Sequence, residues 1–235
     1  MRPIRSLLAM LAVATIALTG CGQGDANGDA TSQTTPAVTP SSTSAGSTGA
    51  TATTKPGSEQ AVAAARQFLR GEVGMGELVA GPFKATGSDT GELSFRLKYG
   101  EGGRPMPATA PQTTVRLQRY ANGWAVTGTS SSNIRVGDPV RFERIASPVA
   151  VAGRASAFEG TVEVLVTEDR TGKDRALGRG VVTGSGTAEL GPFSGRISFS
   201  KPTADAGWVL FYTESEADGV GILEATALRI RFAGA

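Results

Sequence analysis

The sequence predicts a mainly β protein, in which an antiparallel β-sandwich at the C-terminal end follows a small N-terminal α+β domain. Short segments in which apolar and polar residues alternate recur from residue 91 onward, and this alternation is typical of half-buried strands. Only one segment, directly after residue 57, has apolar residues at helical spacing. Glycine is abundant, with 32 residues, which favours turns between short strands.

The N-terminal segment has the outline of a secretory signal peptide, which we expect to cover residues 1–20. Arg2 and Arg5 precede an uncharged, apolar run from Leu7 to Leu18. This run holds about a dozen residues, whereas a helix that spans a membrane needs about 20. Its length therefore favours a signal peptide over a transmembrane helix.

The signal segment ends in Leu18-Thr19-Gly20-Cys21, which resembles the lipobox of bacterial lipoproteins. The resemblance implies cleavage between Gly20 and Cys21 and attachment of diacylglycerol, with acyl chains such as palmitate, to the Cys21 thiol. Two or more acyl chains hold a protein stably at a membrane. We therefore expect a lipid anchor on the extracytoplasmic face of the cell membrane. Cys21 is the only cysteine, so the folded part then contains no disulfide.

A linker rich in Thr, Ser, Ala, Gly and Pro follows the cysteine and extends to residue 57. Such a segment buries too little apolar surface to offset the entropy lost on ordering, so we expect residues 21–57 to be a disordered tether. As a flexible coil, the tether spans roughly 30 to 36 Å on average. Its threonines and prolines also suit sugar attachment, and a plain linker is the simpler interpretation.

The first folded element expected is a helix that begins at Ser58, suited to the N-cap, and ends at Gly71, where a C-cap glycine belongs. Its apolar face is formed by Val62, Ala65, Phe68 and Leu69. Packing of this face on an adjoining sheet is the simpler interpretation, and a helix that binds a partner is the alternative.

Strands complete the α+β domain, which we expect to cover residues 58–138. Residues 91–99 alternate apolar and polar side chains, with Leu93 and Phe95 on one face. Residues 113–128 form two strands joined through Asn122-Gly123, a dipeptide that favours a two-residue hairpin turn. The intervening segment is rich in Gly and Pro and is expected to be a loop.

The C-terminal domain is expected to begin near Asp138 and to cover residues 139–235. Strands are expected near residues 140–145, 148–153, 160–169, 177–184, 193–200, 207–215 and 221–232. Seven short strands are typical of an immunoglobulin-like sandwich. Alternation points Val164 into its core and Glu163 to the opposite face. Trp208 and Val209 also lie on opposite faces, and periodicity does not say which of the two is inside.

Motifs in the same region resemble the immunoglobulin-like domain associated with bacterial spore germination and sporulation. They are Ser147-Pro148, Val151, Gly153, Ala155, Phe158-Glu159-Gly160, the alternating valines to Val166, Gly172, Gly191-Pro192-Phe193-Ser194, Glu214-Ser215 and Asp218-Gly219. The resemblance covers residues 145–232. It implies a secreted protein or lipoprotein of a Gram-positive bacterium, in which this domain often accompanies a second small extracytoplasmic domain. No catalytic residues are known for this family, so none is transferred.

The composition argues against several kinds of chemistry. Histidine is absent, which removes the usual general base and the commonest zinc ligand. The formal net charge of +2, without a basic stripe, argues against nucleic acid as a partner. Glu214, Glu216 and Asp218 have the residue types of a carboxylate hydrolase, but their spacing also fits an ordinary solvated strand end. We therefore expect no catalytic residue and no cofactor.

A calcium site is the other candidate, because Glu168, Asp169 and Asp174 lie close together in the sequence. Their spacing does not match a calcium-binding loop, so we expect no metal and interpret Asp169 and Gly172 as turn residues. Phe158 stands at the entry of a strand, where a phenylalanine normally enters the core.

Two functions remain open, and no binding residue is identified for either. The first is a non-catalytic binding or scaffold lipoprotein, whose sheet edges or loops contact an envelope protein or wall polymer. The second is an envelope enzyme or a small lipid or ligand carrier that uses a pocket in residues 58–138. A large apolar cavity favours the carrier, and a filled core favours the binding module.

Overall fold

Strands make up most of the described chain, which in this computed structural model comprises residues 57–215 and 221–234. The helices and strands are α1 (Ser58–Phe68), η1 (Leu69–Val73), β1 (Leu78–Ala80), β2 (Lys84–Ala85), β3 (Thr90–Leu97), η2 (Glu101–Gly103), β4 (Thr113–Tyr120), β5 (Gly123–Ser131), β6 (Ile134–Asp138), β7 (Arg144–Ile145), β8 (Val149–Ala155), η3 (Phe158–Gly160), β9 (Thr161–Glu168), η4 (Lys173–Arg175), β10 (Gly178–Thr183), β11 (Gly191–Ile197), β12 (Ala206–Glu214) and β13 (Ile222–Phe232). The expected signal peptide, Gly20, Cys21 and the tether up to residue 56 lie outside the described residues, as do Glu216 and Asp218.

Helix α1 packs its apolar face on the N-terminal strands, as the sequence predicts. Ala61, Ala65 and Leu69 have no exposed surface. The expected end at Gly71 is wrong, because the chain continues through the π-helical turn η1 and leaves the helix at Gly74, whose φ is 84°. This extension buries Val73 completely. Within the described residues, no helix is long and apolar enough to cross a membrane.

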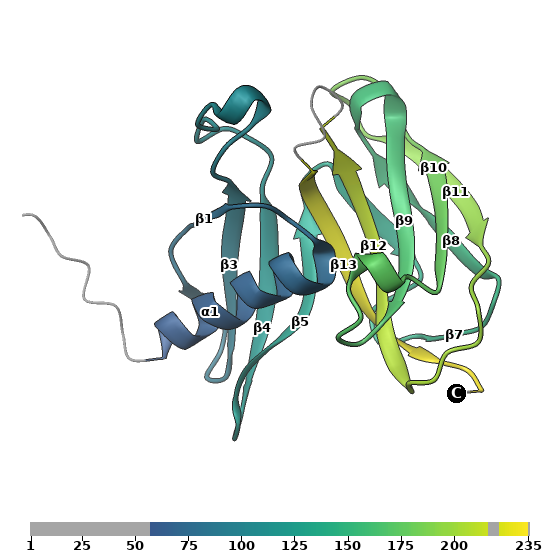
Figure 1. Ribbon diagram of the computed structural model, residues 1–235, viewed down its shortest axis with the longest axis horizontal. Coiled ribbons are helices and arrows are strands. Elements are labelled where there is room, and N and C mark those ends of the chain that lie inside the picture. Colours follow the sequence, from purple (N-terminus) through teal and green to yellow (C-terminus); the bar gives the residue numbers. More distant parts are fainter. Residues whose placement is uncertain (1–56, 216–220, 235) are drawn as a thin grey trace, which may run out of the picture. The chain divides into compact units, whose positions relative to one another are not determined.

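The strands form two antiparallel sheets. In the described chain the larger sheet has the order β1-β3-β4-β5-β13-β12-β9-β10, with β2 added to β3 and β7 added in parallel to β13. The smaller sheet has the order β11-β8-β6. Figure 1 shows α1 lying across β3, β4 and β5, while β12, β9 and β10 continue the same sheet beyond β13. The larger sheet therefore runs through both predicted domains.

Side-chain hydroxyl groups join the two halves of the larger sheet. Strands β5 and β13 share a single register pair, Leu228 with Gly128. Beside this pair, the Thr129 hydroxyl donates to the Ala225 carbonyl at 2.8 Å and accepts the Ala227 N–H at 2.8 Å. Because Thr129 is fully buried, its hydroxyl satisfies backbone groups that water cannot reach.

Strand β12 contributes to a hydrophobic core on each of its faces. Val209 and Phe211 pack in the sandwich core between the two sheets, together with Val164. Trp208 and Leu210 pack in a second cluster that includes α1. The Trp208 ring lies 4.6 Å from the Phe68 ring, between centroids. The outer face of the larger sheet in the sandwich is therefore covered by the N-terminal helix. The Trp208 face and the Val209 face of β12, between which periodicity does not decide, are both buried.

The predicted mainly β fold with an immunoglobulin-like sandwich is confirmed. Strands β7 to β13 correspond to the seven expected strands, and β6 adds the segment from Ile134 to the smaller sheet. Val164 is fully buried in the sandwich core and Glu163 is only half-buried. All described residues belong to one compact unit. The division into domains of residues 58–138 and 139–235 stays a prediction.

Two local predictions are wrong. Tyr120 pairs with Gly123, so the hairpin turn consists of Ala121 and Asn122, and Gly123 starts β5 with a φ of 119°. Phe158 is 66% exposed instead of buried. It lies in the short helix η3, which interrupts the alternation before β9, so it does not take the inward position that strand periodicity implies.

Candidate functional site

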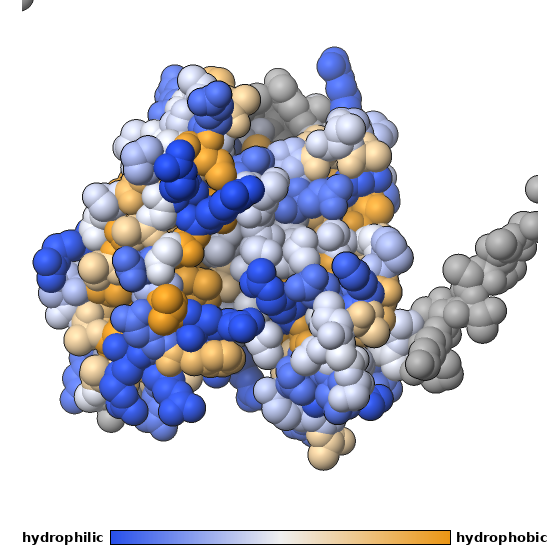
Figure 2. Space-filling view, turned by 180° about the vertical axis from the view of Figure 1, so that it is seen from behind, coloured by the Kyte–Doolittle hydropathy of each residue, from blue (hydrophilic) through white to orange (hydrophobic). Residues whose placement is uncertain are grey.

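Among the residues that the structure describes, no other layer of secondary structure covers the face of β3, β4 and β5 opposite to α1 (Figure 1). Leu93, Phe95 and Leu97 point toward α1 and are buried, so strand alternation places Glu92 and Ser94 on the opposite side. Figure 2 views the molecule from this opposite side, where hydrophilic and neutral side chains occupy most of the right half. We call this side the open face.

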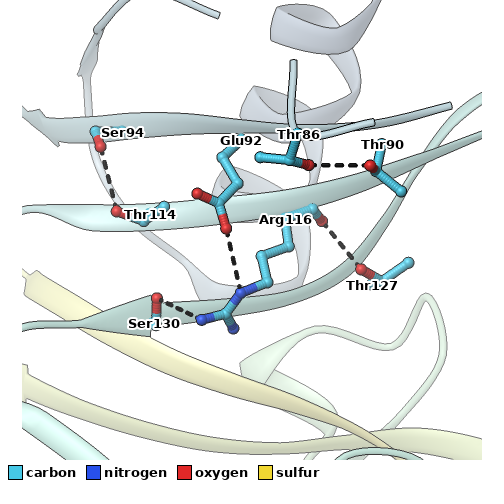
Figure 3. Close-up of polar contacts among 8 residues, drawn as sticks. All are labelled: Thr86, Thr90, Glu92, Ser94, Thr114, Arg116, Thr127 and Ser130. Atoms are coloured by element: carbon cyan, nitrogen blue, oxygen red, sulfur yellow. Dashed lines mark hydrogen bonds and ion pairs between the residues drawn. The ribbon is translucent and has the colours of Figure 1, made fainter. Parts of the chain in front are cut away.

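Short polar contacts order the side chains of the open face (Figure 3). The Arg116 Nε lies 3.5 Å from a carboxylate oxygen of Glu92, and an Arg116 Nη donates to the Ser130 hydroxyl at 3.3 Å. The hydroxyl groups of Ser94 and Thr114 are 3.2 Å apart. Each side chain is thus held by a neighbour on an adjacent strand, so the surface is ordered before a ligand arrives.

A hollow of about 410 Å³ lies at one end of the open face, and we call it the open-face hollow. It is lined by Thr86, Thr90, Gly91, Glu92, Arg116, Leu117, Gln118, Tyr120, Thr127, Arg141 and Phe142. Two of its aromatic side chains are unusually open to solvent, since Tyr120 is 55% exposed and Phe142 is 51% exposed. Exposed aromatic rings beside ordered polar groups are typical of binding surfaces.

The loop between β6 and β7 holds Phe142 in place. The Phe142 N–H donates to the Arg229 carbonyl at 2.5 Å, and the Arg231 N–H donates to the Glu143 carbonyl at 2.8 Å. Both contacts attach the loop to β13. Phe142 has a φ of 68°, a conformation that is strained for a bulky side chain. The loop therefore fixes Phe142 with a strained backbone and an exposed ring.

A second hollow of about 440 Å³ lies beside another part of β4. It is lined by Thr109, Ala110, Pro111, Gln112, Thr114, Ser132 and Asn133. Thr114 of this hollow and Arg116 of the open-face hollow are two residues apart on one side of β4. The two hollows therefore follow each other along the open face.

A third hollow of about 490 Å³ lies beside α1, and we call it the helix-side hollow. Phe68, Trp124 and Val126 give its lining an apolar part. Glu72 and Arg170 also line it. Burial raises the pKa of the Glu72 carboxyl, which accepts the Gly172 N–H at 3.3 Å and so fastens the loop after β9 to η1.

The acidic residues of the candidate calcium site have separate partners. The Glu168 carboxylate accepts the N–H groups of Thr203 and Ala204, and these hydrogen bonds lower the pKa of its carboxyl. Asp169 forms an ion pair with Arg229, and Asp174 is exposed. Among the residues that the structure describes, no group of three or more His, Cys, Asp or Glu is arranged to hold a metal ion.

Of the three candidate catalytic carboxylates, Glu214, Glu216 and Asp218, only Glu214 lies among the described residues. Its carboxylate lies 3.9 Å from the Lys173 ammonium. The structure also brings it near Glu163, which the sequence does not associate with it. The pKa of the Glu163 carboxyl is raised, first by burial and then by the negative charge of Glu214.

Glu224 is a buried acidic residue that sequence reasoning missed. Its side chain accepts hydrogen bonds from the Ser131 hydroxyl and, at 2.9 Å, from the Asn133 amide. Burial raises the pKa of its carboxyl, and the two hydrogen bonds oppose that effect. Glu224 lies in β13 at the junction with β5. The pattern of polar and apolar residues in this strand does not indicate that its side chain points inward.

The residues of the open-face hollow were also missed by sequence reasoning. The sequence predicts a strand at Arg116 and Tyr120 and a short strand near residues 140–145, which includes Phe142. The structure restricts β7 to Arg144–Ile145, so Phe142 lies in the preceding loop. The one available signal was a phenylalanine between two charged residues, Arg141 and Glu143, close after a proline.

Comparison with known proteins places the second part of the chain in a family. Residues 133–220 match the model of the immunoglobulin-like domain of bacterial spore germination. No curated protein and no solved structure matches the chain. The matched segment includes Arg141 and Phe142, whereas the strands that form the floor of the open-face hollow precede it. Residues 133–220 are therefore similar to this immunoglobulin-like domain.

Proposed function

We propose that this protein is a lipoprotein anchored through Cys21 on the extracytoplasmic face of the cell membrane, and that its folded part is a non-catalytic binding module of the envelope. The apolar leader, the lipobox and the polar linker support the anchor. The matched domain links the chain to germination-related proteins, which supports a role in the envelope.

The exposed Phe142 ring carries the binding part of the proposal. A half-exposed phenylalanine forgoes the stabilisation of burial, and a positive φ adds strain. The first of these costs would be recovered if a ligand covered the ring. Because the two backbone contacts to β13 fix the loop beforehand, little conformational entropy is lost when the ligand binds.

Co-sedimentation with envelope material tests this proposal. Residues 22–235 are prepared without the anchor and mixed with purified walls and membranes of the producing bacterium. Phe142→Ala and Tyr120→Ala are expected to weaken binding by about tenfold, as for central aromatic anchors. Phe158→Ala is the matched control, because this phenylalanine is 66% exposed but lines a different hollow, together with Glu163 and Glu214. Equal binding by all three variants and the wild type would refute the proposal that Phe142 and Tyr120 belong to the binding surface.

A ligand carrier is the second candidate function, and the helix-side hollow is the observation that favours it. Two features weigh against an apolar ligand there. Glu72 and Arg170 place charged groups in the lining, and Ala61, Ala65, Leu93 and Phe95 fill the space between α1 and the sheet. Uptake of a fluorescent fatty acid that Val126→Glu abolishes would favour the carrier over the binding module.

A further inference from the structure

We propose that the open-face hollow and the second hollow together bind a linear polysaccharide that carries carboxylate groups. This inference rests on the proposed binding function and names the ligand of the same surface. Its support comes from the shape of the surface, the chemistry of its lining and the balance of charge.

The shape favours a linear ligand over a compact one. Thr114, Arg116 and Gln118 occupy alternate positions of β4 and so lie on one side of it, about 7 Å apart from one to the next. Thr114 lines the second hollow, and Arg116 and Gln118 line the open-face hollow. A ligand that follows β4 would pass Thr114 of the second hollow and then Arg116 and Gln118 of the open-face hollow.

The lining suits sugar rings. The second hollow contributes hydroxyl and amide side chains from Thr109, Gln112, Thr114, Ser132 and Asn133. Such groups both donate and accept hydrogen bonds, as the hydroxyl groups of sugars require. Tyr120 and Phe142 in the open-face hollow add exposed ring faces. Sugar rings have apolar C–H faces that pack on aromatic rings, so both parts of a sugar find a matching surface.

The charge of the open-face hollow favours an acidic ligand. Arg116 is paired with Glu92, at 3.5 Å. Arg141 lines the same hollow, its guanidinium lies 5.4 Å from the centroid of the Phe142 ring, and no ion pair to it occurs among the described residues. One positive charge is therefore uncompensated beside an aromatic ring. A carboxylate on a sugar that packs on Phe142 would lie within reach of Arg141 and form a charge-assisted hydrogen bond.

Other polymers fit this surface less well. A peptide that binds by strand addition needs a free sheet edge, but β4 pairs with β3 on one side and with β5 on the other. A nucleic acid needs several cations along its backbone, and the second hollow has no charged side chain in its lining. The polysaccharide is therefore the occupant that shape and charge both favour.

Isothermal titration of residues 22–235 with two matched probes tests the inference. The first probe is the peptide-free glycan strand of peptidoglycan, in which every second sugar carries a carboxylate. The second is the N-acetylglucosamine hexamer, which has the same backbone without carboxylates. We expect the glycan strand to bind about tenfold more tightly than the hexamer, the advantage of one charge-assisted hydrogen bond. A uronic acid hexamer serves as a third probe and reports whether the carboxylate alone, independent of the backbone, is recognised.

Two arginine variants separate the named contact from a general charge effect. Arg141→Gln should weaken binding of the glycan strand about tenfold and so remove its preference over the hexamer. Arg196→Gln, an exposed residue of β11 on the far edge of the smaller sheet, should change neither affinity. Unchanged thermal melts would establish that both variants are folded. An equal loss of affinity for the glycan strand in both variants would overturn the role of Arg141.

The outcome also distinguishes this inference from the proposed function. Binding to envelope material that Phe142→Ala weakens, without binding of any saccharide probe, would overturn the polysaccharide and leave the binding module standing. Binding to envelope material that Phe142→Ala does not weaken would overturn both.

Discussion

Removing the N-terminal half should unfold the immunoglobulin-like sandwich, although the sandwich has its own core. The perturbation is a chain that begins at residue 133, where the family match begins, compared with a chain of residues 51–235. The shorter chain keeps β6 to β13 but lacks α1 and β1 to β5. It therefore exposes the outer face of β9, β12 and β13.

The cost follows from the outer-face side chains that pack in one cluster with the N-terminal segment. Leu165, Leu210 and Ile222 have no exposed surface, and Trp208 is only 4% exposed. All four belong to the cluster that includes α1. Burial of one such side chain stabilises a fold by about 1.5 to 3 kcal/mol, so the four together contribute about 6 to 12 kcal/mol as an upper bound. A typical domain has a net stability of about 5 to 15 kcal/mol, so the loss is comparable to the whole.

Urea denaturation followed by near-ultraviolet circular dichroism measures the effect. We expect residues 51–235 to unfold in one cooperative transition, and residues 133–235 to lack a tertiary signal in buffer. A cooperative transition of the shorter chain at the same urea midpoint would refute the reasoning. It would also support two independently folding domains with a boundary near Asp138.

Three further predictions concern single residues. Cys21→Ser should move the protein from the membrane fraction to the supernatant or leave an uncleaved precursor, and a processed, membrane-bound variant in fractionation would contradict the lipid anchor. Val164→Asp should unfold the protein because it buries an unpaired carboxylate, whereas Glu163→Gln on the opposite face should shift thermal melts little; equal sensitivity at both positions would disprove the register. Burial raises the pKa of the Glu224 carboxyl, so the folded state binds this proton more tightly than the unfolded chain does. The protonated carboxyl therefore adds to the free energy of unfolding at low pH, and this contribution is lost as the pH rises from the ordinary Glu pKa through the pKa in the folded state. Glu224→Gln should flatten this fall in urea melts recorded from the ordinary Glu pKa upward, and an unchanged profile would count against it.

Local pattern determined much of the fold. Alternation in residues 161–168 predicted β9 and its register, because one face of that strand, with Val162, Val164 and Val166, is uniformly apolar. Helical spacing likewise predicted α1 and its buried face. In both cases the residues that decide the structure lie within a few positions of each other, so the sequence alone contains the information.

Tertiary structure alone decided the second core and the open-face hollow. Trp208 and Val209 belong to two apolar faces of β12, and alternation identifies a core only when one face is polar. The second face is buried because α1, distant in sequence, packs on it. Phe142 likewise has the residue type of a core position, but backbone contacts between its loop and β13 hold it at the surface. Such contacts join segments far apart in the chain, and neither periodicity nor composition encodes them.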